Sequence, residues 1–192
     1  MNTAAAFPVA VGCWLVFFLY WAISALSSKA AKKSESARER LKRMIPLTAA
    51  YLLLFYNATS LGWLNKRFVT DSAAAAVIGV SFTAAGVAFA IWARWHLGTN
   101  WSAIVSIREE HVLIRSGPYR RVRHPIYTGM LLAMAGTALV LGEVRGLLAF
   151  AITLFAFYSK ARKEEAWLSH EFGEKFAEHT KRTGMFLPKP GG

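Results

Sequence analysis

Apolar and polar residues alternate along this chain in long blocks rather than with the short periods of a soluble fold. Five apolar blocks stand out, and they cover residues 7–28, 44–64, 73–93, 126–141 and 146–158. A helix needs about 20 apolar residues to cross the hydrocarbon core of a bilayer. The first three blocks have that length, whereas the last two are shorter. We therefore expect an all-α integral membrane protein with about five transmembrane helices.

The last two blocks are separated only by residues 142–146, which begin and end with glycine, as is typical of a tight turn. We expect the two blocks to form a compact helical hairpin. Their lengths leave two arrangements open, a pair of short transmembrane helices or a partly re-entrant pair.

The C-terminal tail is more polar, and its apolar residues recur with a helical spacing. One face of such a helix would carry Ala161, Leu168, Phe172 and Phe176. Gly184 and Pro188 mark its end. The tail is too polar to span a bilayer, so we expect a cytosolic amphipathic helix. It would lie at the membrane surface or fold over the connector that precedes the hairpin.

Basic residues are concentrated between the apolar blocks and give the chain a net charge of +12. This placement favours anionic lipid headgroups, and not nucleic acid, as partners. The basic residues are numerous in 29–43, in 94–124 and in the tail, and few in the two remaining loops. Cytoplasmic loops are enriched in Lys and Arg. We therefore expect a multi-pass protein with its N-terminus outside and its C-terminus in the cytoplasm, located in the inner or plasma membrane if the source is bacterial.

Several classes of chemistry lack a signature in this sequence. A single cysteine, Cys13, excludes a disulfide framework within the chain and a multi-cysteine metal site. There is no Gly-rich phosphate loop, no Cys/His metal spacing and no hydrolase nucleophile elbow. We therefore predict no metal site.

Three polar features lie on the expected cytoplasmic side. Residues 123–129 (RHPIYTG) open the fourth block, Glu164-Glu165 follow the fifth, and 111–119 lie in the connector. Each has a plain structural interpretation: the first as an interfacial helix cap, the second as acids neutralised by basic neighbours, and the third as a connector. Among these neighbours, Lys160 lies four residues before Glu164, so the two side chains are expected to pair on a helix. Functionally, the helix start and the connector could hold a small molecule, and an inward-facing acid could receive a sulfonium or an amino group.

In their order and spacing these features resemble the isoprenylcysteine carboxyl methyltransferase family, which is related to the phospholipid N-methyltransferases. The resemblance covers about residues 94–188 and also includes 97–102 (LGTNWS) and Phe172-Gly173. It implies S-adenosylmethionine as cofactor, held on the cytosolic side over the hairpin, and a lipophilic or prenylated substrate that enters from the bilayer. We therefore divide the chain into three N-terminal transmembrane helices (1–93) and an S-adenosylmethionine-binding catalytic region (94–192).

The resemblance also implies roles for individual residues. The cofactor would be bound by His111, Val112, Leu113, Ile114, Tyr119, His124, Pro125, Ile126, Tyr127 and Glu164. The catalytic residues would be Lys160, Arg162 and Glu165. Family members of the isoprenylcysteine type carry arginine where this chain has Lys160, and lysine keeps the charge but lacks the planar fork. The nature of the methyl acceptor therefore stays open.

Three functions remain compatible with the sequence. The first is methyl transfer from S-adenosylmethionine to a lipophilic acceptor, most like isoprenylcysteine carboxyl O-methylation. The second is N-methylation of a phospholipid or another lipid amine, for which Glu165 or His124 would be the base. The third is a non-catalytic membrane protein that keeps the fold as a binding or scaffolding module. Cofactor binding separates the third from the first two, and the methylated product separates the first from the second.

Overall fold

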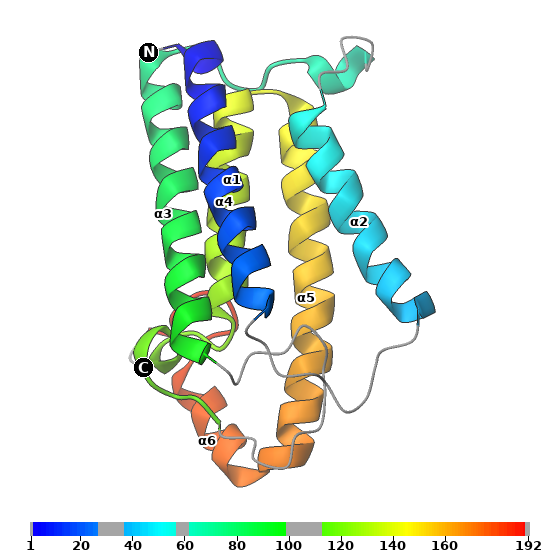
Figure 1. The fold of residues 1–192 in the computed structure, drawn as a ribbon, viewed down its shortest axis with the longest axis vertical. Coiled ribbons are helices and arrows are strands. Elements are labelled where there is room, and N and C mark those ends of the chain that lie inside the picture. The colour runs from blue at the N-terminus through cyan, green and yellow to red at the C-terminus, as the bar shows by residue number, and fades with distance from the viewer. Residues whose placement is uncertain (1, 27–36, 57–61, 99–112, 191–192) are drawn as a thin grey trace.

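The computed structural model describes residues 2–26, 37–56, 62–98 and 113–190, which form a helical bundle with a small helical region at one end (Figure 1). The bundle consists of α1 (Thr3–Leu26), α2 (Ala37–Phe55), α3 (Ala73–Leu97), α4 (Pro125–Leu141) and α5 (Val144–Phe172). The end region contains α6 (Glu174–Arg182) and the 3-10 helix η3 (Gly117–Arg120), and a second 3-10 helix, η1 (Gly62–Asn65), follows α2. The described residues form no β-strand, so the expected all-α class is confirmed.

Three of the described helices, α1, α3 and α5, are long and apolar enough to cross a membrane. The apolar part of α2 (Met44–Phe55) and the whole of α4 are shorter. Large apolar side chains on the outside of the bundle, such as Leu15, Leu19 and Phe155, are exposed. Such a surface is typical of contact with lipid.

The helices α3 and α4 pack closely through small residues. A Cβ atom built on Gly136 would lie 2.5 Å from the backbone oxygen of Gly79. One built on Gly129 would lie 2.6 Å from the backbone oxygen of Gly86. Small residues permit this approach of helices in a membrane. The close packing places the start of α4 beside the end of α3. The polar motif 123–129 therefore lies next to the end of α3.

The helices that contain the second and fifth apolar blocks have other bounds than the sequence predicted. α2 begins at Ala37 and ends at Phe55, whereas we expected residues 44–64. Its first turns contain Arg, Glu, Leu and Lys, which favour helix although they are polar or charged for the most part. α5 is a single helix of 29 residues that includes the fifth block, so the prediction of a short partner in the hairpin is wrong.

The turn of the hairpin is tighter than predicted. α4 ends at Leu141 and is capped by Gly142, which adopts a left-handed conformation with φ +67°, and Glu143 is already the N-cap of α5. Arg145 donates a hydrogen bond of 2.6 Å to the carboxylate of Glu143, and it also donates to the carbonyl oxygens of Leu53 and Tyr56 in the α2 region. Residues 144–146 are therefore helical, and Arg145 ties the start of α5 to the end of α2.

The predicted tail helix does not begin where we expected. α5 continues from the apolar block to Phe172, because no glycine or proline interrupts residues 147–172. The break comes at Gly173, with φ +48°, after which α6 begins. Phe176 of α6 is buried, as the predicted apolar face requires, and α6 ends just before Gly184.

Candidate functional site

The start of α4 is held in place by the C-terminal segment of the chain. The backbone N–H of Arg123 donates to the carbonyl of Gly184 at 2.9 Å, and that of His124 donates to the carbonyl of Met185 at 3.1 Å. Thr128 secures the same segment, since its hydroxyl donates to the carbonyl of Phe186 at 2.7 Å. From the sequence we expected backbone N–H groups at this helix start to be free to hold a small molecule. The amides of Arg123 and His124 are instead bonded to the chain itself and are not open to a ligand.

A cluster of polar side chains joins the start of α4 to the end of α5. The side chain of His124 reaches both acids of α5, with Nδ1 3.4 Å from Glu164 Oε2 and Nε2 3.2 Å from Glu165 Oε1. Tyr127 donates its hydroxyl hydrogen to Glu164 at 2.8 Å. Arg123 donates from Nε to Glu165 at 2.7 Å. We call these five residues the carboxylate cluster. It lies beyond the apolar part of α5, and His124 is only 7% exposed.

The charges of the carboxylate cluster are strongly coupled. Burial alone would lower the pKa of His124, but hydrogen bonds to Glu164 and Glu165 and their charges raise it above its usual value. Burial would raise the pKa of Glu165, yet contacts with His124 and Arg123 lower it to about 2. The pKa of Glu164 is lowered against burial in the same way, first by its hydrogen bond with His124. Both carboxylates are therefore ionised at neutral pH.

Aromatic rings and one lysine border the carboxylate cluster. The ring of Tyr127 stacks on Phe157, with 4.8 Å between centroids, and lies parallel to the imidazole of His124 at 5.4 Å. Lys160 Nζ lies 5.2 Å from the centre of the Tyr127 ring and 3.6 Å from Glu164 Oε1, which confirms the predicted pairing of Lys160 with Glu164. The arrangement places two ionised carboxylates beside aromatic faces, and Arg123, His124 and Lys160 balance their charge. Carboxylates and aromatic faces are both features that bind cationic ligands.

Tyr119 lies in an apolar cluster next to this site. It is buried together with Ala93 of α3 and Ile126 of α4, and Ile114 packs against them. Its hydroxyl donates to the carbonyl of Ala93 at 3.4 Å. Burial raises the pKa of Tyr119, and the charge of Glu164 adds to this effect. The structure thus brings Tyr119, Ile114 and Ile126 together beside the carboxylate cluster.

The remaining predicted site residues differ in their placement. Pro125 is buried in the first turn of α4, and Leu113 is half-buried in the connector. Arg162 is exposed on α5 and makes no ion pair with the carboxylate cluster. His111 and Val112 lie outside the described residues.

Sequence reasoning missed Arg123 and Phe186 as members of the site. The motif that contains Arg123 was recognised, but a basic residue before a membrane helix is equally typical of an interfacial anchor. Phe186 lies beyond the predicted end of the tail, where no periodicity indicated a contact. Its ring lies 6.2 Å from His124 and 6.4 Å from Tyr127, measured between centroids.

Comparison with known proteins identifies similar sequences and a similar fold. The model of the phospholipid methyltransferase family matches residues 74–175. The protein-S-isoprenylcysteine O-methyltransferase of Schizosaccharomyces pombe is 33% identical over 94 residues, which are 47% of this chain and 40% of that protein. The enzyme of the same name from Rattus norvegicus is 30% identical over 129 residues, which are 66% of this chain and 44% of that protein.

Among solved structures, that of the eukaryotic intramembrane Ras methyltransferase, an isoprenylcysteine carboxyl methyltransferase, has a similar fold. The TM-score is 0.55 at 19% identity, with 82% of this chain and 54% of that chain covered. This likeness establishes a shared membrane fold, in agreement with the three long apolar helices. The chain spans less than half the length of the curated relatives described above.

Proposed function

Because the chain belongs to the phospholipid methyltransferase family, we propose that it is a membrane-embedded methyltransferase that uses S-adenosylmethionine to methylate a lipophilic acceptor. The acceptor we favour is a prenylated cysteine carboxylate, in line with the names of the relatives. The observation that carries this proposal is the carboxylate cluster. Two ionised acids meet His124 at the point where a membrane helix begins and another leaves the apolar region.

The residues present fit the proposed cofactor. S-adenosylmethionine supplies an electrophilic methyl group on a sulfonium, and it also carries an ammonium and an adenine. Glu164 provides negative charge, and the ring of Phe186, beside that of Tyr127, provides an aromatic surface that attracts a cation. The apolar cluster around Tyr119 and Ile126 would take the adenine. In this proposal the region 94–192 forms the catalytic part and 1–93 its membrane scaffold.

The protonation states favour a carboxylate acceptor over an amine. Methylation of a carboxylate forms a C–O bond and breaks the C–S bond, and no proton needs to be removed. An amine must first lose a proton to a base. Glu165, with a pKa of about 2 and bonds to Arg123 and His124, is a weak base. His124, whose pKa is raised, favours the protonated form. N-methylation would therefore need a base from elsewhere.

Lys160 is suited to meet the acceptor. Its ammonium borders the carboxylate cluster without being buried in it, since its side chain is 26% exposed. We propose that Lys160 attracts the acceptor carboxylate and thereby orients it toward the methyl group, which is the main requirement of a displacement reaction. The carboxylate cluster, α6 and the connector would lie on the cytoplasmic side, with the N-terminus outside.

Titration of S-adenosylmethionine into the purified protein in an uncharged detergent tests the proposal. We expect saturable binding to the wild type and a loss of about tenfold or more in affinity for His124→Ala, because the variant leaves both acids without their shared partner. His170→Ala is the matched control, since His170 is exposed on α5. Absence of binding to the wild type would favour a non-catalytic membrane module instead.

A further inference from the structure

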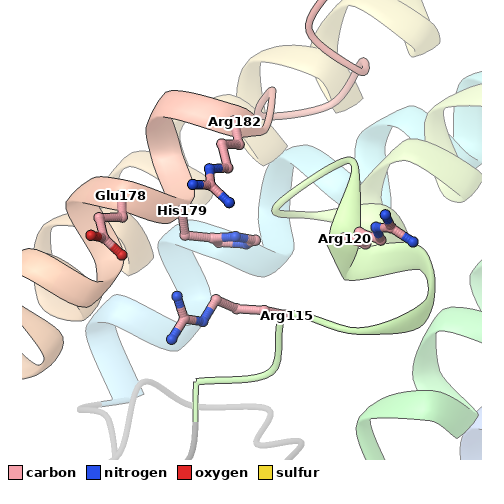
Figure 2. A pocket seen from close by; sticks show the side chains of 5 residues that line it. All are labelled: Arg115, Arg120, Glu178, His179 and Arg182. Atoms are coloured by element: carbon pink, nitrogen blue, oxygen red, sulfur yellow. The ribbon is translucent and has the colours of Figure 1, made fainter. Parts of the chain in front are cut away.

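A cavity of about 440 Å³ lies between α6 and the connector that leads into α4. It is lined by Arg115 and Arg120 of the connector and by Glu178, His179 and Arg182 of α6. Figure 2 shows the ring of His179 between the side chains of Arg115 and Arg182. None of these five residues belongs to the carboxylate cluster, so the cavity is a separate feature of the same end of the molecule.

The lining of the cavity carries excess positive charge. Three arginines line it, and Glu178 is its one lining acid within the described part of the chain. No hydrogen bond or ion pair involves the side chains of Arg115, Arg120 or Arg182 among the described residues. Like charges gathered in one cavity repel each other unless an anion lies between them. The cavity therefore has the charge of an anion-binding site.

His179 adds a polar group that is directed to the same cavity. The residue is 7% exposed, and its imidazole makes no hydrogen bond with any residue that the structure describes. Burial lowers the pKa of His179, and the charges of Arg115 and Arg123 lower it further. A neutral imidazole still offers one N–H donor. Because the imidazole lines the cavity, it can offer this donor to a ligand there.

We propose that this cavity binds a phosphate group, supplied either by a phospholipid headgroup or by a soluble phosphate ester. Arginine forks match phosphate oxygens in pairs, and donors from two segments can surround a tetrahedral anion. A lone carboxylate would be satisfied by one of the three arginines. The bound phosphate would join α6 to the connector that precedes Tyr119, and it would offset the repulsion between Arg115 and Arg182. This site does not depend on the proposed methyl transfer.

Binding of short-chain phosphatidic acid and of glycerol 3-phosphate to the purified protein, measured by calorimetry in an uncharged detergent, tests the proposal. The two probes share the phosphate headgroup and differ in their acyl chains. We expect saturable binding of at least one probe. Tighter binding of the lipid would identify a headgroup site, and equal binding of both would identify a site for soluble phosphate esters. Lack of saturable binding by both probes would overturn the proposal.

Variants locate the site. Arg182→Gln and Arg115→Gln should each weaken binding of the better probe about tenfold or more, as expected for loss of a charge-assisted hydrogen bond. Lys181→Gln, a neighbouring exposed position of α6 that does not line the cavity, should leave the affinity unchanged. Equal affinities in all three variants, with unchanged circular dichroism, would refute the proposal. It would also be refuted if Arg182→Gln weakened S-adenosylmethionine binding as strongly, since the cavity would then belong to the cofactor site.

Discussion

Glu165→Gln is the substitution that tests the physical account of the carboxylate cluster most sharply. The Glu165 carboxylate accepts from Arg123 at 2.7 Å and lies 3.2 Å from His124, and all three side chains are largely buried. Glutamine keeps the shape of the side chain but removes its charge. Two buried cationic groups then lose their shared anion, a change that destabilises a folded protein more than the loss of a surface pair does.

The magnitude follows from the pKa of Glu165. A decrease from 4.5 to about 2 corresponds to about 3 kcal/mol of stabilisation at neutral pH. Because glutamine can still accept one hydrogen bond, we expect Glu165→Gln to lose about 2 kcal/mol. For a chain of this length, that loss lowers Tm by about 4–8 °C. Glu171→Gln, an exposed position on the same helix, should lose less than about 0.5 kcal/mol.

The pH dependence has a defined sign. The pKa of Glu165 is lower in the folded protein than in the unfolded one, so its contribution is complete above about pH 4.5 and is lost as pH falls toward 2. The pKa of His124 is raised by folding. Its contribution to stability is therefore complete in mild acid and is lost as pH rises through the raised pKa of the folded protein. The difference in Tm between wild type and Glu165→Gln should therefore be largest in mildly acidic solution.

Thermal unfolding in an uncharged detergent, followed by tryptophan fluorescence between pH 3 and pH 8, measures this difference. Glu171→Gln is scanned in parallel. The account of charge coupling within the carboxylate cluster is refuted if the two variants lose the same small amount of stability. It is also refuted if the Tm difference between wild type and Glu165→Gln does not depend on pH.

Three further predictions concern the cofactor, the topology and the packing. Glu164→Gln should weaken S-adenosylmethionine binding about tenfold or more in calorimetry, whereas Lys160→Ala should keep that affinity and reduce turnover. Small, equal effects of the two substitutions would instead indicate that the pair is only a surface salt bridge. A cysteine at Ser169, which is exposed on α5, should react with an impermeant maleimide only from the cytoplasmic side, and labelling from outside would refute the orientation. Gly136→Ala should lower the free energy of unfolding by about 1–3 kcal/mol, because the added Cβ would meet the backbone of α3. Gly12→Ala, with open space around it, should not lower it, and equal stability of the two variants would contradict the α3–α4 contact.

The apolar blocks predicted where helices lie better than where they end. Hydropathy reports burial in lipid, and it cannot show that α5 continues for some 14 residues past Tyr158 as a polar helix. Helix propensity and the absence of a breaker before Gly173 contained that information. The same reasoning explains why α2 begins at Ala37, within a charged segment.

The candidate site could be predicted only in part, because its members meet through tertiary contacts. The pairing of Lys160 with Glu164 follows from helical spacing and was predicted correctly. The contact of His124 with both acids joins residues about 40 positions apart, and no local pattern indicates it. The tail segment that holds Arg123 and His124 through backbone hydrogen bonds is equally invisible, because such bonds do not depend on side-chain type.

The most direct test of the central claim is transfer of a labelled methyl group from S-adenosylmethionine by the purified, membrane-reconstituted protein. Two acceptors are offered side by side, a farnesylated cysteine derivative with a free carboxylate and phosphatidylethanolamine. The account predicts label in the farnesylated cysteine as a base-labile ester, little label in the amine lipid, and loss of transfer in Glu164→Gln. Label found only in phosphatidylethanolamine, or equal incorporation by wild type and Glu164→Gln, would contradict it.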